Sequence, residues 1–566
     1  MTIAPLPDSL NFPGLIAGGG INRSVNSIGL QIGELLVANN VSATSSGFSN
    51  ISGGITKLNT NTISGVVRGG TVFKGLSVFV AGGNVFTMPL NGGSATLVAA
   101  SVFDPNKSIS FAAAKGSGED KLYMCDGVNV PRAWNGATIT TVSAFSGTVL
   151  STFNPANGYP DKITFFQNRL VWSWPASSSY RNYVLFSTFL DADDYTQGIP
   201  ADATDPFFEE IAPGRGSIAA ISSIRQSLQD YQSEVLAVFK EPSETYLSSQ
   251  IEFGGGIVST TFNRQALDFG AANQNSVVPF QNSLVVLSKN GIGELASATD
   301  SGSVNVLTYQ LGNRVNPLVK PGGFNYAWSV HCPFLQTIWF SFVKDQSITG
   351  SYGGIAYPET PNSLTLCLYY GIFNQNGEIY NCWTTREGDG WGFASAWTDG
   401  VSIFLGSYFG DVYLWGGTGE YERNPATPST AQPFTSTIET GDYTYDQSSF
   451  SVKNIKHLEE LWFAEGSVQS TTCVFKDLKT SGQCITKTAS FNSNLAIYGT
   501  ALYGTGTYAI VGSTYLPRAG FGEFGNYLRI KSSWPSLLGA TSNGASLFGY
   551  RGLYNLGNRL AVNRVR

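Results

Sequence analysis

The sequence is poor in charged residues. Asp, Glu, Lys and Arg make up 13% of its 566 residues, about half the share that is usual in soluble domains. Acidic residues outnumber basic ones, 39 to 33, and the formal net charge is −6. Proteins that grip the phosphate backbone usually carry a basic surplus, so this balance argues against tight nucleic-acid binding. An acidic wall past which DNA slides is compatible with it, because such a wall repels phosphate.

The sequence also lacks the motifs of common catalytic and metal sites. It contains no HExxH, P-loop, GxSxG or zinc-ligand spacing. The two histidines, His331 and His457, leave little material for a catalytic triad. We interpret His331 as a structural core or interface residue and His457 as a surface residue. Gly504 and Gly506 lie in a strand-like stretch that opens no helix, so they are not a dinucleotide fingerprint. We therefore expect no enzymatic activity and no cofactor.

None of the six cysteines belongs to a CxxC pair, which excludes the usual redox and zinc motifs. We expect buried thiols in a reducing compartment. The alternative is a disulfide between Cys473 and Cys484, which flank an expected hairpin at 474–483 and would face one another. The N-terminal stretch has no basic start and no apolar core, so we expect no signal peptide. No run of about 18 apolar residues is present to span a bilayer.

What the sequence does contain is a dense pattern of turns. Glycine accounts for 65 residues and aromatics for 13%, a composition that suits short strands joined by Gly, Asn and Ser turns. Apolar runs such as 71–80, 85–90 and 138–142 are separated by Gly-Gly, Asp-Gly or Asn-Gly pairs. These pairs favour hairpins, because both central residues of a type I′ turn need positive φ.

The irregular spacing of these hairpins predicts an all-β protein with a central β-propeller of about five to seven blades. We expect an N-terminal segment at 1–64, the propeller at 65–433 and a C-terminal β domain at 434–566. The first and last should form one additional β domain, because propellers commonly bring the chain ends close together. The Pro-rich stretch 424–433 is typical of a linker. A set of β-sandwiches is the alternative fold.

Helices should be scarce. Segment 31–39 is a candidate for two helical turns. Segment 223–234 is the better candidate, because Ile224 and Leu228 stand at i and i+4. Neither segment is long enough to define the fold.

One segment is unusually acidic. Its seven carboxylates are a candidate acidic channel or rim loop: Asp191, Asp193, Asp194, Asp202, Asp205, Glu209 and Glu210. The spacing of Asp191 and Asp193 resembles the start of a calcium loop, but the central Gly and terminal Glu are missing. A glycosidase would need two carboxylates facing one sugar, which sequence spacing does not show. A solvated rim loop and an acidic surface facing a DNA channel remain the main interpretations.

The C-terminal end is basic, although the whole chain is acidic. A merely solvated tail is the simpler interpretation of this basic end. The alternative is a docking element, and its candidate residues are Arg551, Arg559, Arg564 and Arg566.

Most tryptophans sit in or beside strand runs, where we expect them to fill blade cores rather than bind sugars. These are Trp172, Trp174, Trp383, Trp391, Trp397, Trp415 and Trp462.

Several segments, read in order, resemble the nozzle or tail-hub (tail tubular B-like) proteins of short-tailed bacteriophages. Segment 33–41 (GELLVANNV) resembles the family's opening strand, and 166–172 (FQNRLVW) its Q-N-R-L strand. A serine-containing strand at 184–188 and an Asp-Tyr turn at 191–195 follow, as in the family. Later stretches are similar to further family strands: 234–246, 284–295, 406–414 with Trp391, and 437–456. Where the family often has paired Arg and Pro-Gly, this sequence has NISGG at 50–54.

The resemblance implies a virion protein of the phage tail, assembled in the host cytoplasm. Such a protein forms a homohexameric ring below the portal and adaptor, retains the genome and later releases it. Its partners would be copies of itself, portal-adaptor proteins, tail fibres or spikes, and genomic DNA in transient, non-specific passage. The family offers no active-site residues to carry over. Two alternatives are a receptor- or glycan-binding propeller and a hydrolase that uses Asp193 or Asp194.

Overall fold

We analysed a computed structural model of the chain. It describes residues 8–12, 20–30, 34–44, 47–49, 54–142, 158–196, 198, 202–228, 231–248, 251–254, 257–265, 269–300, 303–309, 312–319, 324, 326–344, 351–352, 355–373, 379–388, 391–416, 420–422, 431–442, 452–464, 467–476, 482–490, 512–516, 524–525, 528–535 and 545–557.

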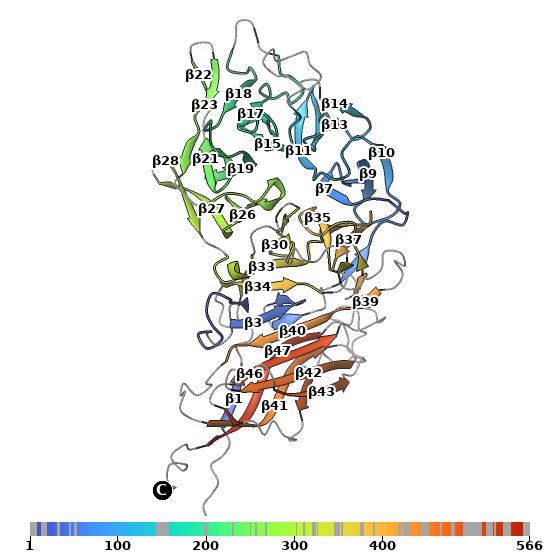
Figure 1. Ribbon diagram of the computed structural model, residues 1–566, viewed down its shortest axis with the longest axis vertical. Coiled ribbons are helices and arrows are strands. Elements are labelled where there is room, and N and C mark those ends of the chain that lie inside the picture. Colours follow the sequence, from blue (N-terminus) through green and yellow to red (C-terminus); the bar gives the residue numbers. More distant parts are fainter. Residues whose placement is uncertain are drawn as a thin grey trace, which may run out of the picture.

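Six separate four-stranded antiparallel sheets are blades of a β-propeller (Figure 1). The first blade holds β7 (Val67–Phe73), β8 (Leu76–Ala81), β9 (Asn84–Pro89) and β10 (Thr96–Ala99). The second holds β11 (Ser110–Gly116), β12 (Glu119–Cys125), β13 (Arg132–Trp134) and β14 (Ile139–Thr141). The third holds β15 (Lys162–Phe166), β16 (Arg169–Ser173), β17 (Tyr183–Phe186) and β18 (Phe207–Glu210).

The later blades follow the same meander. The fourth holds β19 (Ile218–Leu228), β20 (Tyr231–Lys240), β21 (Glu244–Ser248) and β24 (Asn263–Gln265). The fifth holds β25 (Val277–Phe280), β26 (Ser283–Ser288), β27 (Gly291–Asp300) and β28 (Ser303–Tyr309). The last holds β35 (Phe393–Thr398), β36 (Ile403–Ser407), β37 (Val412–Trp415) and the early strand β6 (Ile55–Lys57).

A further blade-like meander fills the gap between the fifth and last blades. It consists of β29 (Trp328–Cys332), β30 (Thr337–Phe342), β33 (Leu364–Phe373) and β34 (Ile379–Arg386), and β29 packs against both β25 and β35. The all-β propeller prediction is therefore confirmed. Within the described residues, the only helices are the single 3₁₀ turns η3 (Gln274–Ser276) and η4 (Asn316–Leu318).

The propeller ring is closed by a strand from near the N-terminus. β6 pairs antiparallel with β37, and the pair continues as hydrogen bonds from Leu58 N to Val412 O (2.8 Å) and from Gly416 N to Gly54 O (3.0 Å). Beside this pair, buried Asp411 accepts from Lys57 Nζ at 2.8 Å and from Asn59 Nδ2 at 3.0 Å. The first strand of the propeller in sequence thus precedes the boundary we expected near residue 65.

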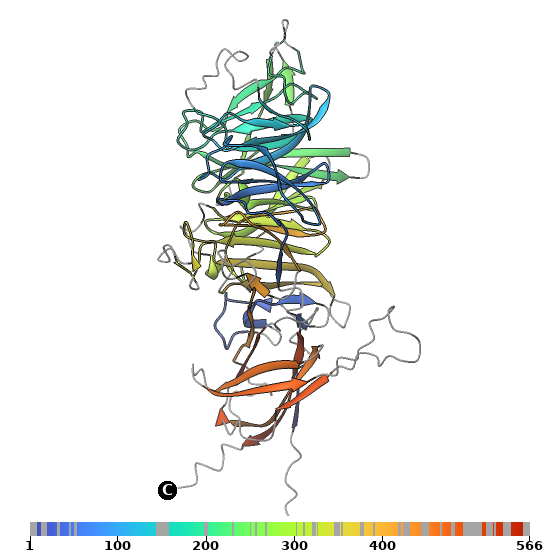
Figure 2. The ribbon, with the colours of Figure 1, turned by 90° about the vertical axis from the view of Figure 1, so that its right-hand side faces the viewer.

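The blade-like meander continues into a second part of the molecule as one ten-stranded sheet. After β34, its order is β2 (Gly20–Ile21), β3 (Glu34–Asn39), β40 (Thr435–Thr440), β46 (Leu528–Pro535), β42 (Ser467–Lys476) and β43 (Gln483–Ser490). N-terminal and C-terminal strands therefore share a sheet, as we predicted. Figures 1 and 2 show the propeller at one end of an elongated molecule and these strands leading away from it.

A seven-stranded sheet and the last strands of the ten-stranded sheet share the end of the molecule away from the propeller (Figures 1 and 2). The seven-stranded sheet contains β1 (Asp8–Phe12), β4 (Ser42–Thr44), β5 (Gly47–Ser49), β41 (Val452–Ala464), β44 (Gly512–Leu516), β45 (Phe524–Gly525) and β47 (Ala545–Gly557). Three two-stranded ribbons complete the described strands: β22 (Ile251–Gly254) with β23 (Ile257–Thr260), β31 (Ser351–Tyr352) with β32 (Ile355–Ala356), and β38 (Glu420–Glu422) with β39 (Ala431–Pro433).

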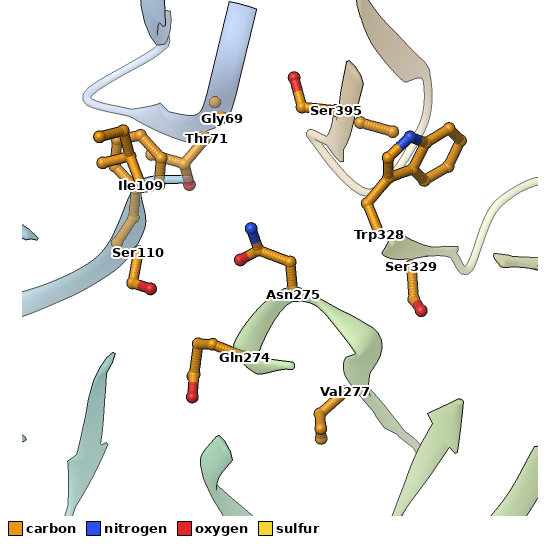
Figure 3. Close-up of a pocket in the computed structure, with 13 residues that line it drawn as sticks. Gly69, Thr71, Ile109, Ser110, Gln274, Asn275, Val277, Trp328, Ser329 and Ser395 are labelled. Atoms are coloured by element: carbon orange, nitrogen blue, oxygen red, sulfur yellow. The ribbon is translucent and has the colours of Figure 1, made fainter. Parts of the chain in front are cut away.

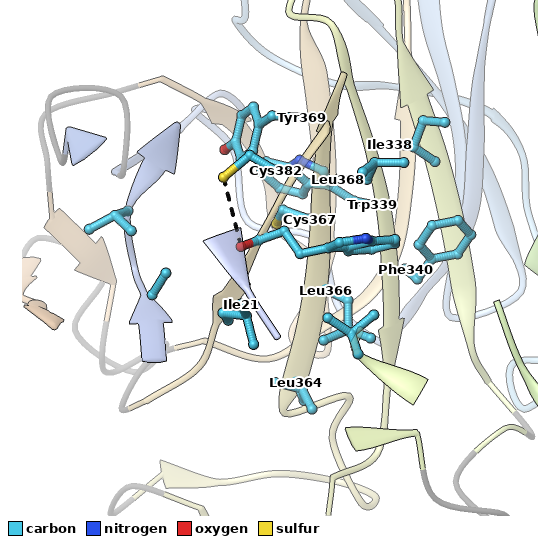
Figure 4. Packing of buried hydrophobic residues seen from close by; sticks show 14 of the residues in the cluster. Ile21, Ile338, Trp339, Phe340, Leu364, Leu366, Cys367, Leu368, Tyr369 and Cys382 are labelled. Carbon is cyan, nitrogen blue, oxygen red and sulfur yellow. Dashed lines mark hydrogen bonds between the residues drawn. The ribbon is translucent and has the colours of Figure 1, made fainter. Parts of the chain in front are cut away.

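The propeller and the terminal strands meet in a continuous core. Gly20 has φ of +58°, and a Cβ there would lie 2.3 Å from the carbonyl oxygen of Trp383, so glycine is needed for β2 to lie against β34. Ile21 belongs to the same buried cluster as side chains of β30, β33 and β34, among them Trp339 and Leu366 (Figure 4). Because the same cluster reaches Trp534 in β46, the two parts are joined by packing as well as by backbone hydrogen bonds.

Both candidate helices are wrong. Residues 34–39 form β3, between β2 and β40, and residues 223–228 and 231–234 belong to β19 and β20, while 31–33 and 229–230 lie outside the described residues. Short isolated helices are marginal, whereas β3 pairs with strands on both sides and the second segment forms the tip of the long β19–β20 hairpin. The run 71–80 also splits into two strands at Lys74 and Gly75, which have φ of +49° and +75°. At the end of the expected linker, Ala431–Pro433 forms β39, and 424–430 lie outside the described residues.

The predicted structural role of the tryptophans is confirmed for the six whose side chains are described. Trp172, Trp174, Trp383, Trp391, Trp397 and Trp415 are all buried. Blades pack face to face, so their central strands are buried on both sides. For example, every residue of β26 (SLVVLS) and β30 (TIWFSF) is buried. This explains why the sequence shows continuous apolar runs as well as alternation.

Candidate functional site: the axial cavity and the acidic rim

A polar, uncharged cavity of about 230 Å³ lies where the inner strands of several blades converge (Figure 3). Its walls come from β7, β11, β29 and β35, together with η3 and the start of β25. The lining residues include Thr71, Ser110, Gln274, Asn275, Trp328 and Ser329. No Asp, Glu, Lys, Arg or His is among the residues that line it. Sequence reasoning missed this site, because its residues are separated by more than 300 positions and form no motif.

The turn η3 is held in place by amide side chains. Gln274 accepts from Ile221 N and donates to Ile221 O, both at 2.9 Å. Asn273 Nδ2 donates to the carbonyl oxygens of Phe324 and Ala327 at 2.8 and 3.0 Å. These bonds tie η3 to β19 and to the segment before β29. Because Asn275 is the middle residue of η3, its position is fixed by the same bonds.

Two glycines let β7 approach the neighbouring blades. A Cβ on Gly70 would lie 2.5 Å from the indole ring of Trp397, and one on Gly69 would lie 2.9 Å from the ring of Phe111. Only a residue without a side chain fits against both rings. The Gly-Gly pair at 69–70 therefore serves packing around the cavity rather than a turn.

The acidic segment lies in and before the outermost strand of the third blade, and its carboxylates have different roles. Asp193 accepts from Lys121 Nζ at 2.5 Å, from Tyr123 OH at 2.7 Å and from Ser117 Oγ at 2.8 Å. Burial opposes ionisation of Asp193, but the hydrogen bonds from Lys121, Tyr123 and Ser117 lower its pKa below the usual value. This carboxylate is already used in a structural network that joins the second and third blades, which makes it poorly suited to serve as a catalytic base.

The loop before β18 is organised around a buried arginine. Arg169, from the Q-N-R-L segment, donates to the carbonyl oxygens of Ser187, Ala203, Thr204 and Asp205 at 2.7–3.1 Å. It is 2% exposed, and burial lowers the pKa of its guanidinium to about 10. The preceding Gln167 and Asn168 form the turn, with φ of +46° and +59°. Sequence analysis noticed this segment only as a resemblance and missed the role of Arg169.

The remaining acidic residues are spread along the same loop and strand. Asp205 is buried and accepts from the backbone N–H groups of Gly198 and Asp202 at 3.0 Å. Asp194 Oδ1 and Asp202 Oδ1 accept from the nearby backbone at Thr196 and Thr204.

Three carboxylates of the segment face other partners. Asp191 Oδ1 accepts from Ser117 N at 2.8 Å. Burial raises the pKa of Glu209, whose carboxylate accepts from Thr260 N. Glu210 stands opposite Tyr183 in the β17–β18 pair, and burial together with this carboxylate raises the pKa of the Tyr183 hydroxyl. The segment is thus a structured rim in which several carboxylates have internal partners.

His331 joins two neighbouring blades. Its Nδ1 lies 2.9 Å from Pro279 O in β25, and its Nε2 lies 2.8 Å from the hydroxyl of Tyr370 in β33. Phe280 packs against both rings. Because a carbonyl oxygen only accepts, Nδ1 carries the proton and the neutral ring can accept from Tyr370 at Nε2. This geometry supports the structural role predicted for His331.

The stability of the protein should therefore fall when His331 becomes protonated. Burial lowers the pKa of His331 below the ordinary value of 6.5, against a smaller opposing effect of its bond to Pro279. The unfolded chain then binds a proton that the folded chain does not, so stability is lost as pH falls through about 6.5. Melting temperatures measured between pH 7.5 and 5.5 should drop less in His331→Gln than in the unaltered protein. His457→Gln is the control, and an equal drop in all three proteins would contradict the prediction.

The cysteines divide into two groups. Cys125, Cys332, Cys367 and Cys382 are free and buried, as predicted. Cys473 and Cys484 instead form a disulfide between directly opposite residues of β42 and β43, so the buried-thiol interpretation is wrong for this pair and its alternative is confirmed. The hairpin brings the two sulfurs together, which the flanking spacing already suggested.

The candidate docking arginines and His457 are placed only in part. The backbone of Arg551 lies in β47, opposite Asn11 of β1 and Glu459 of β41. Arg559, Arg564 and Arg566 lie outside the described residues. His457 lies in β41 and pairs with Leu553.

The described residues hold no group of three or more His, Cys, Asp or Glu side chains arranged to bind a metal ion. Nor does this part of the chain include a helix long and apolar enough to cross a bilayer.

Fold and site together define a β-propeller protein with an uncharged axial cavity and an attached sheet of terminal strands. No protein-family model and no curated protein matches the sequence. Among solved structures, the computationally designed Ika8 protein aligns with 64% of this chain and 99% of its own, at 9% identity and a TM-score of 0.32. BamB from Moraxella catarrhalis aligns with 67% of this chain and 96% of its own, at 10% identity and a TM-score of 0.33. The propeller assignment rests on the strand pairings described above.

Proposed function

We propose that this chain is a structural virion protein of a short bacteriophage tail. Several copies, six in the family it resembles, form a nozzle or hub ring around the DNA exit channel, retain the genome and later release it. The protein acts in the virion tail, and its partners are further copies, portal-adaptor proteins and tail fibres or spikes. It performs this role without catalysis and without a cofactor.

The observation that supports the proposal best is the ten-stranded sheet that runs from the propeller into the terminal strands. A ring that holds a pressurised genome needs subunits that transmit force without bending. At the junction, Asn40 Nδ2 donates to Glu387 O at 2.8 Å and to Thr435 O at 3.1 Å, and Arg386 Nη2 donates to Ser42 Oγ at 2.7 Å. The backbone hydrogen bonds of the sheet, the shared core and these side-chain bonds all stiffen the connection between the propeller and the terminal strands.

The charge of the chain suits a channel for DNA. At −6 for each copy, six copies carry −36, and passing DNA is repelled rather than held. The structured acidic rim of the third blade is our candidate for part of the channel or its mouth. Such a ring also needs basic docking points, and Arg551, in strand β47 at the end of the molecule away from the propeller, is one candidate (Figure 1).

The test is the assembly state of the full-length protein. Mass photometry and negative-stain imaging at micromolar concentration should detect closed rings of about six copies, and labelled antibodies against the chain should decorate the tail end of the virions that contain it. Duplex DNA should show no saturable binding at physiological salt. The proposal fails if the protein is monomeric both when purified and in virions, or if it binds duplex DNA tightly.

A further inference from the structure

We propose that the axial cavity is a binding site for a neutral, polyhydroxylated ligand of monosaccharide size. The inference rests on the cavity alone and holds whether or not the chain assembles into a tail ring. It concerns a site at the centre of a single propeller, away from the acidic rim and the terminal strands.

Polar groups with unused hydrogen-bonding capacity meet in this cavity. Figure 3 shows the amide of Asn275 projecting into its middle, between the strands that carry Thr71 and Trp328. Among the described residues, no hydrogen-bond partner is found for the buried hydroxyl of Ser329. Buried polar groups rarely stay unpaired, so a ligand or solvent should satisfy these groups when the site is filled.

The chemistry of the walls selects for a neutral ligand. Desolvating a charged ligand without an opposite charge costs far more than desolvating a hydroxyl, and no charged side chain lines the cavity. Hydroxyl and amide groups both donate and accept hydrogen bonds, as sugar hydroxyls do. Ile109, Phe111 and Val277 add apolar surface on which the C–H groups of a sugar ring can pack.

The size of the cavity limits the ligand. Its volume is about 230 Å³, below the roughly 300–1,000 Å³ of sites for drug-sized molecules. The space corresponds to about seven or eight waters of liquid volume, which suits one pyranose unit and excludes an oligosaccharide lying wholly inside. Because Gln274 and Asn273 tie η3 to its neighbours, Asn275 needs little rearrangement on binding, which reduces the entropic cost.

Saturation-transfer NMR and titration calorimetry on the full-length protein would test the proposal. The probes are D-glucose, D-galactose, D-mannose and N-acetyl-D-glucosamine, with the charged sugar D-glucuronate for comparison. At least one neutral sugar should bind saturably and raise the melting temperature, and glucuronate should not bind. Asn275→Ala should weaken binding by about tenfold or more, since it removes two directional hydrogen-bonding groups.

Asn91→Ala is the matched control, because Asn91 is exposed and lies in the turn between β9 and β10, the two strands of the first blade farthest from the lining residues of β7. It should leave affinity unchanged. If Asn275→Ala does not fold, Thr71→Val removes a lining hydroxyl while keeping the side-chain shape, and it should also weaken binding. The proposal is overturned if no neutral sugar binds and the cavity holds solvent only. It is equally overturned if glucuronate binds as well as the neutral sugars, or if folded cavity variants bind as tightly as the control.

Discussion

The Thr56→Pro variant should open the propeller ring and lower the free energy of unfolding by about 3 kcal/mol. Thr56 is the middle residue of β6 and stands opposite Leu414 of β37. The flanking bonds, Leu58 N to Val412 O and Gly416 N to Gly54 O, belong to hydrogen-bonded pairs. Such pairs alternate along an antiparallel ladder, so Thr56 donates its N–H to Leu414. Proline removes this donor and leaves the Leu414 carbonyl oxygen unpaired.

Thr56→Ala is the control, because the side chain of Thr56 is exposed and its loss should change stability by no more than about 0.5 kcal/mol. Urea unfolding followed by tryptophan fluorescence reports on the closure, since Trp415 lies at the end of the same strand pair. If the proline and alanine variants unfold at the same urea concentration, β6 does not close the ring as the structure indicates.

The Arg169→Met variant should cost about 4 kcal/mol or more, the largest loss we expect from a single substitution. Four backbone carbonyl oxygens that now accept from the guanidinium would lose their donor, and each buried unsatisfied group costs roughly 1–3 kcal/mol. Methionine fills much of the same space, so the effect reports the lost hydrogen bonds rather than a large cavity. The loop between Thr188 and Asp205 should become sensitive to protease while distant blades stay protected.

Arg181→Met provides the matched comparison, because Arg181 is an exposed arginine of the same blade. It should unfold within about 0.5 kcal/mol of the unaltered protein. Equal stability of the two methionine variants, or equal protease resistance of their loops, would show that Arg169 does not organise the rim. Arg169→Lys should recover only part of the loss, since an ammonium group cannot reach all the carbonyl oxygens that the planar guanidinium reaches.

The sequence was informative where the signal is local. Turns such as Gly82-Gly83 and Asn135-Gly136 mark hairpins, because the positive φ values of Gly82, Gly83 and Gly136 are costly for most other residues. Tryptophans in strand runs were correctly assigned to the core, because burying an indole ring yields a large gain whatever the fold. Sequence analysis failed where local and tertiary preferences disagree, as at Ile224 and Leu228, whose helical spacing was outweighed by the long antiparallel pairing of β19 with β20.

The candidate site was only partly predictable. The acidic segment was recognised as a unit, but sequence could not show that Asp193 is bound by Lys121 and Tyr123 from another blade. The cavity gave no signal, because Thr71, Asn275 and Ser329 look like ordinary strand and turn residues until the blades meet. The candidate docking role of the C-terminal arginines stays a prediction, because only the backbone of Arg551 is described.

By itself, the sequence determined the class of fold: sparse charge, frequent turn residues and short apolar runs leave antiparallel strands as the stable solution. The tertiary structure alone decided that Ile55–Lys57 closes the ring and that Gly20–Ile21 joins a blade to strands from the other end of the chain. Turn formation depends on the φ values of a few adjacent residues, whereas the pairing of distant strands depends on which surfaces bury each other. That second choice is made only when the whole chain is folded.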